Sequence, residues 1–237
     1  TLLAQVDSSI GGKTGINSKY GKNLIGTFYQ PNLVISDTNF LKTLPKREII
    51  SGYAEILKHS LIKNNILFRY LDKNADHILK LKNPFLKKAI FESCLVKKNI
   101  IEKDENEKNL RKILNFGHTF AHAFEATKKY SKKLNHGEAV LLGIICAINF
   151  ANQENYINKS DYKKIINHFK KLNLPMNINK IFLKKSISKI LSFMQKDKKN
   201  NSDKVNLVIL NKIGKTNYNY QCKISKIYKF FKNELIN

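Results

Sequence analysis

The feature that most constrains the fold of this chain is a helical periodicity that begins after Pro45 and fills most of the remaining sequence. Apolar residues recur there at steps of three and four, which places them on one face of an α-helix. Proline suits the first turn of a helix, and the face of this first helix would comprise Ile49, Ile50, Tyr53, Ile56, Leu57 and Leu61. Further helices are predicted at about 66–81, 84–103, 110–127, 137–154, 160–172 and 184–195. Residues 45–237 are therefore predicted to form a helical domain.

Residues 1–44 differ from the rest, because short apolar runs are mixed there with glycines at positions 11, 12, 15, 21 and 26. Residues 32–35 predict a strand, and the glycines indicate turns or close approaches of the backbone. Later in the chain only residues 205–210 predict a strand. The first 44 residues are interpreted as the tail of an α/β unit.

The chain is strongly basic, with 43 Lys and Arg against 18 Asp and Glu and a formal net charge of +25. Such a charge is found in proteins that bind nucleic acid or anionic surfaces. The lysines are, however, spread over every segment and do not form one stripe interleaved with aromatic residues, as a groove for single-stranded nucleic acid would need. The over-use of Lys, Asn and Ile indicates compositional drift instead. A general positive field would still attract a phosphorylated substrate.

Neither a membrane span nor a disulfide framework is expected. The longest apolar stretch, residues 139–150, is interrupted by Gly143 and Asn149 and is shorter than the roughly 18 residues of a span, so it predicts a buried helix. No signal peptide is expected at the N-terminus, and the start on Thr1 suits a partial chain. The cysteines at positions 94, 146 and 222 form no CxxC pair, which disfavours a thiolate zinc site and favours a reducing cytoplasm.

The strongest local signal is a set of polar residues within the helix predicted at 110–127. At about 100° per residue, one narrow stripe presents Arg111, Asn115, His118 and His122, whereas the apolar residues fall largely on other faces. A solvated face would more plausibly carry Lys and Glu. The spacing alone is weak evidence, because two surface histidines four apart are common, and the Glu that follows the first histidine in metalloproteases is Thr119 here.

Two further polar clusters stand beside this stripe. Glu55 and Lys58 are three residues apart and share a helix face, which is also the spacing of an ordinary surface ion pair. His136 and Glu138 precede an apolar helix, where Glu138 would also stabilise the positive end of the helix dipole. Together the clusters offer one carboxylate and two or three imidazoles. Two histidines and a glutamate with open positions form a recognised catalytic zinc site, although spacing does not show that they converge.

A series of motifs resembles the 3-dehydroquinate synthases and follows their order along essentially the whole chain. They are residues 5–14 (QVDSSIGGKT), 21–26 (GKNLIG), 28–31 (FYQP), 41–45 (LKTLP), 52–58 (GYAEILK), 104–105 (DE), 110–111 (LR), 114–122 (LNFGHTFAH), 136–138 (HGE) and 197–199 (DKK). Residues 12–14 do not form a phosphate-binding P-loop, because that motif needs a glycine where this chain has Asp7.

The resemblance implies a mainly helical metal-binding domain, preceded at residues 1–44 by the tail of an α/β nucleotide-binding domain. The implied enzyme is a carbon–oxygen lyase of the shikimate pathway that acts on a phosphate. It would convert 3-deoxy-D-arabino-heptulosonate 7-phosphate to 3-dehydroquinate and phosphate through transient oxidation, β-elimination, re-reduction and intramolecular aldol closure. The implied cofactors are a tightly bound NAD and one divalent metal, zinc or cobalt. A cytoplasmic homodimer is expected at full length, with no nucleic-acid or membrane partner.

The resemblance also assigns site residues. The metal ligands would be Glu55, His118 and His136. Residues with a catalytic part would be His122 as a base near the substrate, Glu107 as a further proton acceptor, and Lys13, Lys58 and Asn115. Substrate would be held by Asp7, Lys13, Asn23, Lys58, Lys97, Arg111, Asn115, His122 and one of Lys198 and Lys199. NAD would contact Thr1, Lys13, Lys22, Phe40, Leu41, Lys42 and Thr43.

The chain departs from the family pattern in two ways. Ala121 precedes His122 where the family usually has glycine, which adds one methyl group to the helix. The N-terminal half with its glycine-rich dinucleotide turn is absent, so the isolated chain is expected to be nearly inactive. Three alternatives stay open: another sugar-phosphate cyclase, which would share nearly every motif; an iron-dependent polyol dehydrogenase, which would lack much of the Lys and Arg set; and a basic helical nucleic-acid-binding protein.

Overall fold

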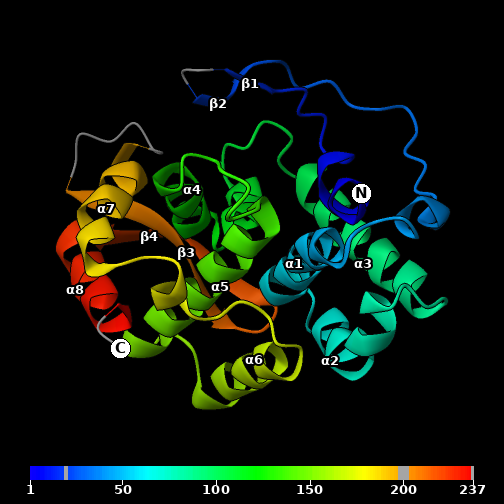
Figure 1. Ribbon diagram of the computed structural model, residues 1–237. Helices are drawn as coiled ribbons and strands as arrows, with labels where there is room; N and C mark the ends of the chain where they lie inside the picture. The colour runs from blue at the N-terminus through cyan, green and yellow to red at the C-terminus, as the bar shows by residue number, and fades with distance from the viewer. Residues whose placement is uncertain (19–20, 197–202, 236–237) are drawn as a thin grey trace. The chain divides into compact units, whose positions relative to one another are not determined.

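A computed structural model describes residues 1–18, 21–196 and 203–235 of the chain (Figure 1). The chain divides into two compact units, the first made of Thr1–Ser60 with Asn64–Leu114, the second of Leu61–Lys63 with Asn115–Asn237. The predicted limits of 1–44 and 45–237 follow the change in sequence character instead. Most of the described residues are helical, which confirms the predicted fold class.

The first unit begins with irregular structure and continues into three helices. A short π-helix, η1 (Ala4–Ser8), precedes the antiparallel strands β1 (Ile16–Ser18) and β2 (Gly21–Ile25) and the 3-10 turn η2 (Thr38–Leu41). The helices are α1 (Lys46–Lys63), whose last turn belongs to the second unit, α2 (Asn65–Leu79) and α3 (Phe85–Ile101). Helix α3 packs against both α2 and η1. The apolar face predicted for α1 is buried except for the half-buried Ile50, with Tyr53, Ile56 and Leu57 fully inaccessible.

The strand predicted at residues 32–35 is wrong. This segment has no regular structure, and Leu33 and Ile35 expose 74% and 81% of their surface. A strand needs a neighbour that satisfies its backbone N–H and C=O groups, and in the described part of the chain no other strand pairs with this segment. The apolar run therefore stays extended and exposed.

The second unit is built around α5 (His136–Gln153). Residues Ala139 to Ile148 of this helix are all buried, as expected for a helix that is apolar on every face. Helix α4 (His118–Thr127) packs against α5 and against α7 (Ile187–Lys196), and α6 (Lys159–Lys171) also contacts α5. Short 3-10 turns, η4 (Ile178–Lys180) and η5 (Lys184–Ser186), precede α7. The predicted buried helix at 139–150 is confirmed.

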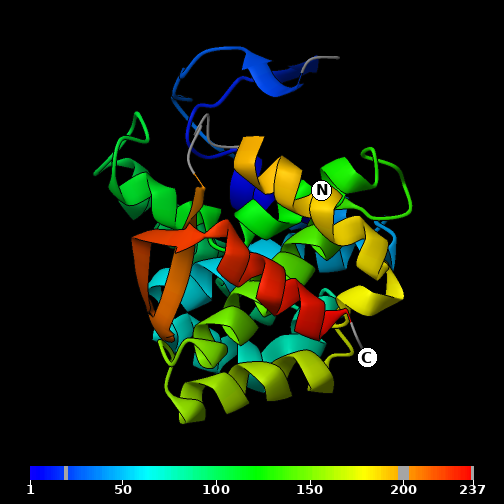
Figure 2. The same ribbon diagram turned by 90° about the vertical axis from the view of Figure 1, so that its left-hand side faces the viewer.

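An antiparallel hairpin completes the second unit. Strand β3 (Lys204–Lys212) confirms the strand predicted at 205–210 and packs against α5, and β4 (Lys215–Lys223) pairs with it. In Figure 2 the orange hairpin continues into the red helix α8 (Ile224–Glu234). The prediction that no other late strand exists is wrong. Strand β4 escaped it because most of its side chains are exposed or half-buried and few are apolar. Helix α8 was not predicted either, although its buried Ile227, Phe230 and Phe231 have helical spacing.

Among the described residues, no helix combines the length and the apolar character that a membrane crossing requires.

Candidate active site

The predicted polar stripe from Arg111 to His122 is wrong, because residues 110–127 do not form one helix. Residues Leu110–Asn115 form a 3-10 helix, η3, and α4 begins only at His118. Between them Gly117 has a positive φ of 76°. This value interrupts a regular helix, and residues with a Cβ rarely adopt it. His118 and His122 still share a face of α4, and the centroids of their rings lie 5.4 Å apart. Arg111 belongs to the first unit, whereas both histidines belong to the second.

The start of α5 brings a third imidazole to this pair. Asn135 caps the helix by accepting a hydrogen bond from the Glu138 N–H at 2.8 Å, while Glu138 accepts one from the Asn135 N–H at 3.0 Å. This reciprocal capping box defines where the helix begins, and it makes His136 the first helical residue. The ring centroid of His136 lies 5.7 Å from that of His118. The motif at 136–138 is thus a genuine helix start, and it places the candidate ligand His136 on the first turn of α5.

The second unit holds these imidazoles together through a very close helix crossing. A Cβ on Gly143 of α5 would lie 2.2 Å from the carbonyl oxygen of Gly117, and one on Gly117 would lie 2.8 Å from the backbone nitrogen of Ile144. Neither position has room for a side chain. The two glycines therefore set the distance between α4, which carries His118, and α5, which carries His136.

The hydrogen bonds of His118 and His136 suit a metal-binding role. His136 Nδ1 lies 3.2 Å from the carboxylate of Glu125, and His118 Nδ1 lies 3.3 Å from the carbonyl oxygen of Phe116. Both partners are acceptors, so the proton belongs on Nδ1 and the lone pair on Nε2. Histidines that bind metals usually have this second contact, which orients the ring and selects the tautomer. The donor chemistry therefore fits a divalent cation. The buried Glu125 was not predicted, because nothing in the sequence distinguishes it from a surface glutamate.

The third predicted ligand, Glu55, lies in the first unit as part of a buried ion pair with Lys58. Their side chains are 0% and 2% exposed, and the Lys58 ammonium contacts Oε2 of Glu55 one helical turn away. The shared face predicted for these residues is confirmed, and an ordinary surface pair is excluded. Burial of two charges costs several kcal/mol per ion before pairing is counted. The burial of this charged pair on α1 therefore indicates a functional role for Glu55 and Lys58.

A second ion pair connects Asp7 with Lys97. The ammonium of Lys97, on α3, donates to the Asp7 carboxylate at 2.6 Å and to the Asp7 carbonyl oxygen at 2.5 Å. Asp7 lies on the π-helix η1, a rare geometry that often marks functional positions. Burial alone would raise the pKa of Asp7, but the positive charges of Lys97 and Lys58 hold this pKa well below its usual value. Asp7 is therefore a carboxylate at neutral pH.

Lys13, Glu107 and Arg111 form a third cluster in the first unit. The ammonium of Lys13 pairs with the carboxylate of Glu107, and the Arg111 guanidinium donates to the carbonyl oxygens of Gly11, at 2.8 Å, and of Glu105. Arg111 is buried, and a Cβ on Gly11 would collide with it at 2.6 Å. Two segments that are far apart in the sequence, 11–13 and 105–111, are thus brought together.

The remaining predicted residues are more dispersed. Phe40 is 76% exposed and Lys42 and Thr43 are exposed, whereas Leu41 is fully buried and anchors its segment. Thr1 accepts a hydrogen bond from the Ala4 N–H, and Asn115 ends η3. Lys22 and Asn23 lie on β2, but their side chains are outside the described residues, as are Lys198 and Lys199 altogether.

A fully buried histidine, His59, lies beside the first two ion pairs and was not predicted. His59 Nδ1 lies 2.7 Å from Ser93 Oγ. Burial, and next the charge of Lys58, hold the pKa of His59 well below its usual value, so the ring is neutral. One atom each of Asp7, Glu55 and His59 lie within 4.8 Å of one another. Because Lys97 and Lys58 already neutralise the two carboxylates, this group is an ion-pair cluster with a neutral neighbour and not a cation site.

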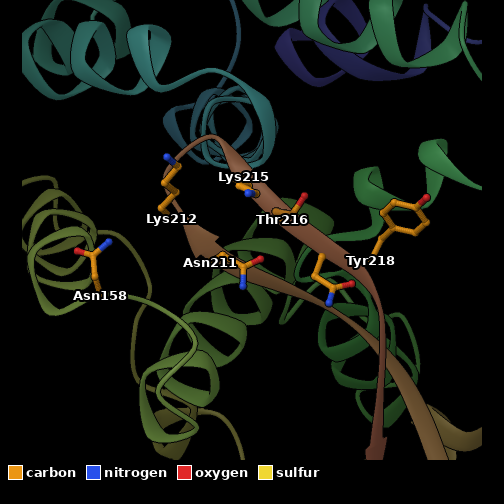
Figure 3. A pocket seen from close by; sticks show the side chains of 7 residues that line it. Asn158, Asn211, Lys212, Lys215, Thr216 and Tyr218 are labelled. Carbon is orange, nitrogen blue, oxygen red and sulfur yellow. The ribbon is translucent and has the colours of Figure 1, made fainter.

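A cavity of about 590 Å³ lies elsewhere in the second unit, at the turn between β3 and β4. Figure 3 shows the polar side chains around it, and its lining comprises Asn158, Asn211, Lys212, Lys215, Thr216, Asn217 and Tyr218. None of them is a predicted site residue. This cavity is therefore separate from the candidate site residues on α4 and α5 and in the ion pairs of the first unit.

Comparison with known proteins explains this combination of residues. Residues 52–200 match the family described as 3-dehydroquinate synthase C-terminal, and residues 1–51 match 3-dehydroquinate synthase N-terminal. The chain belongs to the 3-dehydroquinate synthase family. It is 59% identical over 235 residues to the 3-dehydroquinate synthase of Pelagibacter ubique, which covers 99% of this chain and 64% of that protein. A relative from Alkaliphilus metalliredigens is 44% identical over 209 residues, or 88% of this chain and 57% of the relative. The chain thus spans less than two thirds of these relatives.

Solved structures with the same fold belong to other cyclases. The 2-epi-5-epi-valiolone synthase of Streptomyces hygroscopicus, with NAD+ and Zn2+ bound, has a TM-score of 0.86 and 22% identity, and covers 99% of this chain and 64% of its own. A 2-deoxy-scyllo-inosose synthase complexed with carbaglucose-6-phosphate, NAD+ and Co2+ has a TM-score of 0.83 and 26% identity, covering 98% and 65%. Because the dehydroquinate synthases are far closer in sequence, the alternative of a different sugar-phosphate cyclase is not favoured.

Proposed function

We propose that this chain is the metal- and substrate-binding part of a 3-dehydroquinate synthase. The full-length protein would convert 3-deoxy-D-arabino-heptulosonate 7-phosphate to 3-dehydroquinate and phosphate, a carbon–oxygen lyase reaction. The observation that carries the proposal is the arrangement of His118 and His136. Their ring centroids lie 5.7 Å apart, and Nδ1 of each ring is directed at a hydrogen-bond acceptor. Family membership supplies the reaction, and this geometry supplies the metal chemistry that the reaction needs.

Glu55, His118 and His136 would hold the metal. Two neutral imidazoles and one carboxylate leave a divalent ion with a net positive charge, which suits zinc or cobalt. When bound, such an ion would stabilise a negatively charged substrate oxygen, and NAD would accept a hydride and later return it. Glu55 belongs to the first unit and both histidines to the second, so their convergence is part of the proposal. The contact of Lys58 with Oε2 of Glu55 would fix the carboxylate's orientation.

The cations of the first unit would bind the substrate's phosphate, carboxylate and hydroxyls. Lys97 and Asp7 form an ion pair, and either residue could replace that contact with a hydrogen bond to a substrate hydroxyl group. Arg111 and Lys13 offer charge-assisted bonds to an anion, and the further contacts would come from Asn23, Lys58, Asn115 and one of Lys198 and Lys199. Because the segments that carry Lys97 and Arg111 are fixed by buried contacts, they would hold one substrate conformer and so lower the entropic cost of the reaction.

Two groups would move protons. His122 lies one helical turn from His118 on α4, so its imidazole would take or deliver a proton near the leaving phosphate. Glu107 would accept a further proton once substrate has displaced it from Lys13. Residues 1–44 would complete the nucleotide-binding domain, with NAD contacts from Thr1, Lys13, Lys22 and residues 40–43. A cytoplasmic homodimer with no nucleic-acid partner completes the proposal.

The test is phosphate release from the heptulosonate phosphate by the full-length protein, with NAD and zinc present. His118→Ala is expected to lose bound zinc and to lose turnover, while the matched control His77→Ala, which removes an exposed histidine stacked on Phe85, keeps both. Retention of stoichiometric zinc and a near-normal rate in His118→Ala would remove His118 from the ligand set. Absence of dehydroquinate formation by the wild-type protein would refute the function itself.

A further inference from the structure

We propose that Phe28 is a positioning residue, whose ring holds the Lys13 ammonium and the Arg111 guanidinium together as one anion-binding site. The Lys13 Nζ lies 5.8 Å from the centroid of the Phe28 ring, and the Arg111 Cζ lies 5.3 Å from it. Both distances are within the range in which the negative face of an aromatic ring attracts a cation. Because Lys13 and Arg111 are proposed to bind substrate, this inference rests on the proposed function.

The backbone around Phe28 is built to keep the ring in place. Lys13 and Phe28 are opposite partners in an antiparallel bridge, and the Tyr29 N–H donates to the Gly12 carbonyl oxygen at 2.7 Å. Gly12 has a positive φ of 65°, and a Cβ there would lie 2.8 Å from the carbonyl oxygen of Tyr29. Side chains that face each other in this way approach within about 5 Å at Cβ. The position of the Lys13 side chain is therefore coupled directly to that of the Phe28 ring.

Arg111 reaches the same ring from another segment of the first unit. Its guanidinium donates to the carbonyl oxygens of Gly11 and Glu105, which fixes the plane of the group next to the 11–13 segment. The Arg111 side chain is buried, whereas Lys13 and Phe28 are about half exposed. An anion arriving from solvent would thus meet the half-exposed Lys13 ammonium first and the buried Arg111 guanidinium after it.

An aromatic ring suits this place better than a carboxylate would. A carboxylate between the two cations would neutralise them, whereas the quadrupole of a ring attracts both and leaves their full charge for a ligand. In this structure the countercharge on Lys13 is the carboxylate of Glu107. A phosphate or carboxylate group of the substrate carries at least as much charge and can contact both cations, so it would displace Glu107 from Lys13.

The first experiment measures binding of inorganic phosphate to this chain by isothermal titration calorimetry at low salt. Phe28→Leu is expected to weaken binding about 5- to 30-fold, which is the loss of two cation–ring contacts. Phe28→Tyr keeps the ring and should bind within about twofold of wild type. Tyr29→Leu is the matched control, since it changes the exposed neighbour and keeps the backbone bond to Gly12. Pentafluorophenylalanine at position 28 preserves the shape of the ring while removing its negative face. Its phosphate affinity should fall as expected for Phe28→Leu, so it replaces that variant if the leucine variant does not fold.

A double-mutant cycle with Lys13→Met separates positioning from a general structural role. The loss caused by Phe28→Leu should shrink in the Lys13→Met background, because the two residues act on one contact. In the full-length enzyme, Phe28→Leu should raise KM for the heptulosonate phosphate with little change in kcat. Unaltered phosphate binding in the leucine and pentafluoro variants, or none by the wild-type chain, would overturn the proposal. A wild-type enzyme that forms no dehydroquinate refutes the function alone, because the phosphate series still decides the role of Phe28.

Discussion

Replacing Gly143 by alanine tests the helix crossing that sets the spacing of the site histidines. The new Cβ would lie 2.2 Å from the carbonyl oxygen of Gly117, a backbone atom that cannot rotate away, and 3.0 Å from the nitrogen of Ala121. Carbon and oxygen ordinarily approach no closer than about 3.3 Å, so α4 and α5 must separate locally by roughly 1 Å. Such overpacking costs about 1–3 kcal/mol, while the better helix propensity of alanine returns about 1 kcal/mol.

The net loss in the free energy of unfolding should therefore be at most about 2 kcal/mol, which corresponds to a fall in Tm of up to about 8 °C for a chain of this size. Urea unfolding followed by circular dichroism measures it, with Gln153→Ala as a control for alanine at an exposed position of the same helix. Zinc affinity should fall as well, since the change moves the helices of His118 and His136 apart. A Gly143→Ala variant that is more stable than wild type, by the higher helix propensity of alanine, would show that Gly143 does not lie against the carbonyl oxygen of Gly117.

Three further predictions concern groups whose partners are known. Glu125→Gln should lower zinc affinity about 10- to 100-fold, measured by competition with a chelator, because the orienting acceptor of His136 loses its charge; an unchanged affinity would contradict that role. Asn135→Ala should cost about 1 kcal/mol in metal-free urea unfolding, since it removes the capping box of α5, and a smaller loss than that of an exposed α5 substitution would refute it. Burial raises the pKa of the Cys94 thiol to about 11, so its alkylation by iodoacetamide should be slow at pH 8 and accelerate as pH approaches that value; fast reaction at pH 8 would disprove this.

Most of the helices were predictable because they bury a regular apolar face, which periodicity reports directly; α8 has such a face as well and was missed. The failures have physical causes. Strand β4 exposes most of its side chains and so lacks an apolar signature. Residues 32–35 have the composition of a strand but, within the described residues, no strand to pair with. The helix predicted at 110–127 failed because a single glycine, Gly117, adopts a conformation that the apolar spacing around it does not reveal.

The family motifs name candidate site residues, but they do not name the contacts that support them. The motifs name His118 and His136, whereas the acceptors of their Nδ1 protons are Glu125 and a backbone carbonyl oxygen. Likewise the resemblance names Lys13 and Arg111 but not the ring between them. These partners are ordinary residue types whose role depends on the fold bringing distant segments together. Spacing in the sequence carries no information about that.

The distribution of charge separates function from composition in this chain. Among the described residues only three of the lysines and arginines are buried, namely Lys58, Lys97 and Arg111, and each of them belongs to the predicted substrate-binding set. Burying a cation is costly unless a partner compensates it. Here Glu55 and Asp7 compensate the two lysines, and backbone carbonyl oxygens hold the arginine. Exposed lysines cost little and can accumulate by drift, so the net charge of +25 says little about function. The three buried cations are those whose desolvation cost the binding of an anionic substrate would offset.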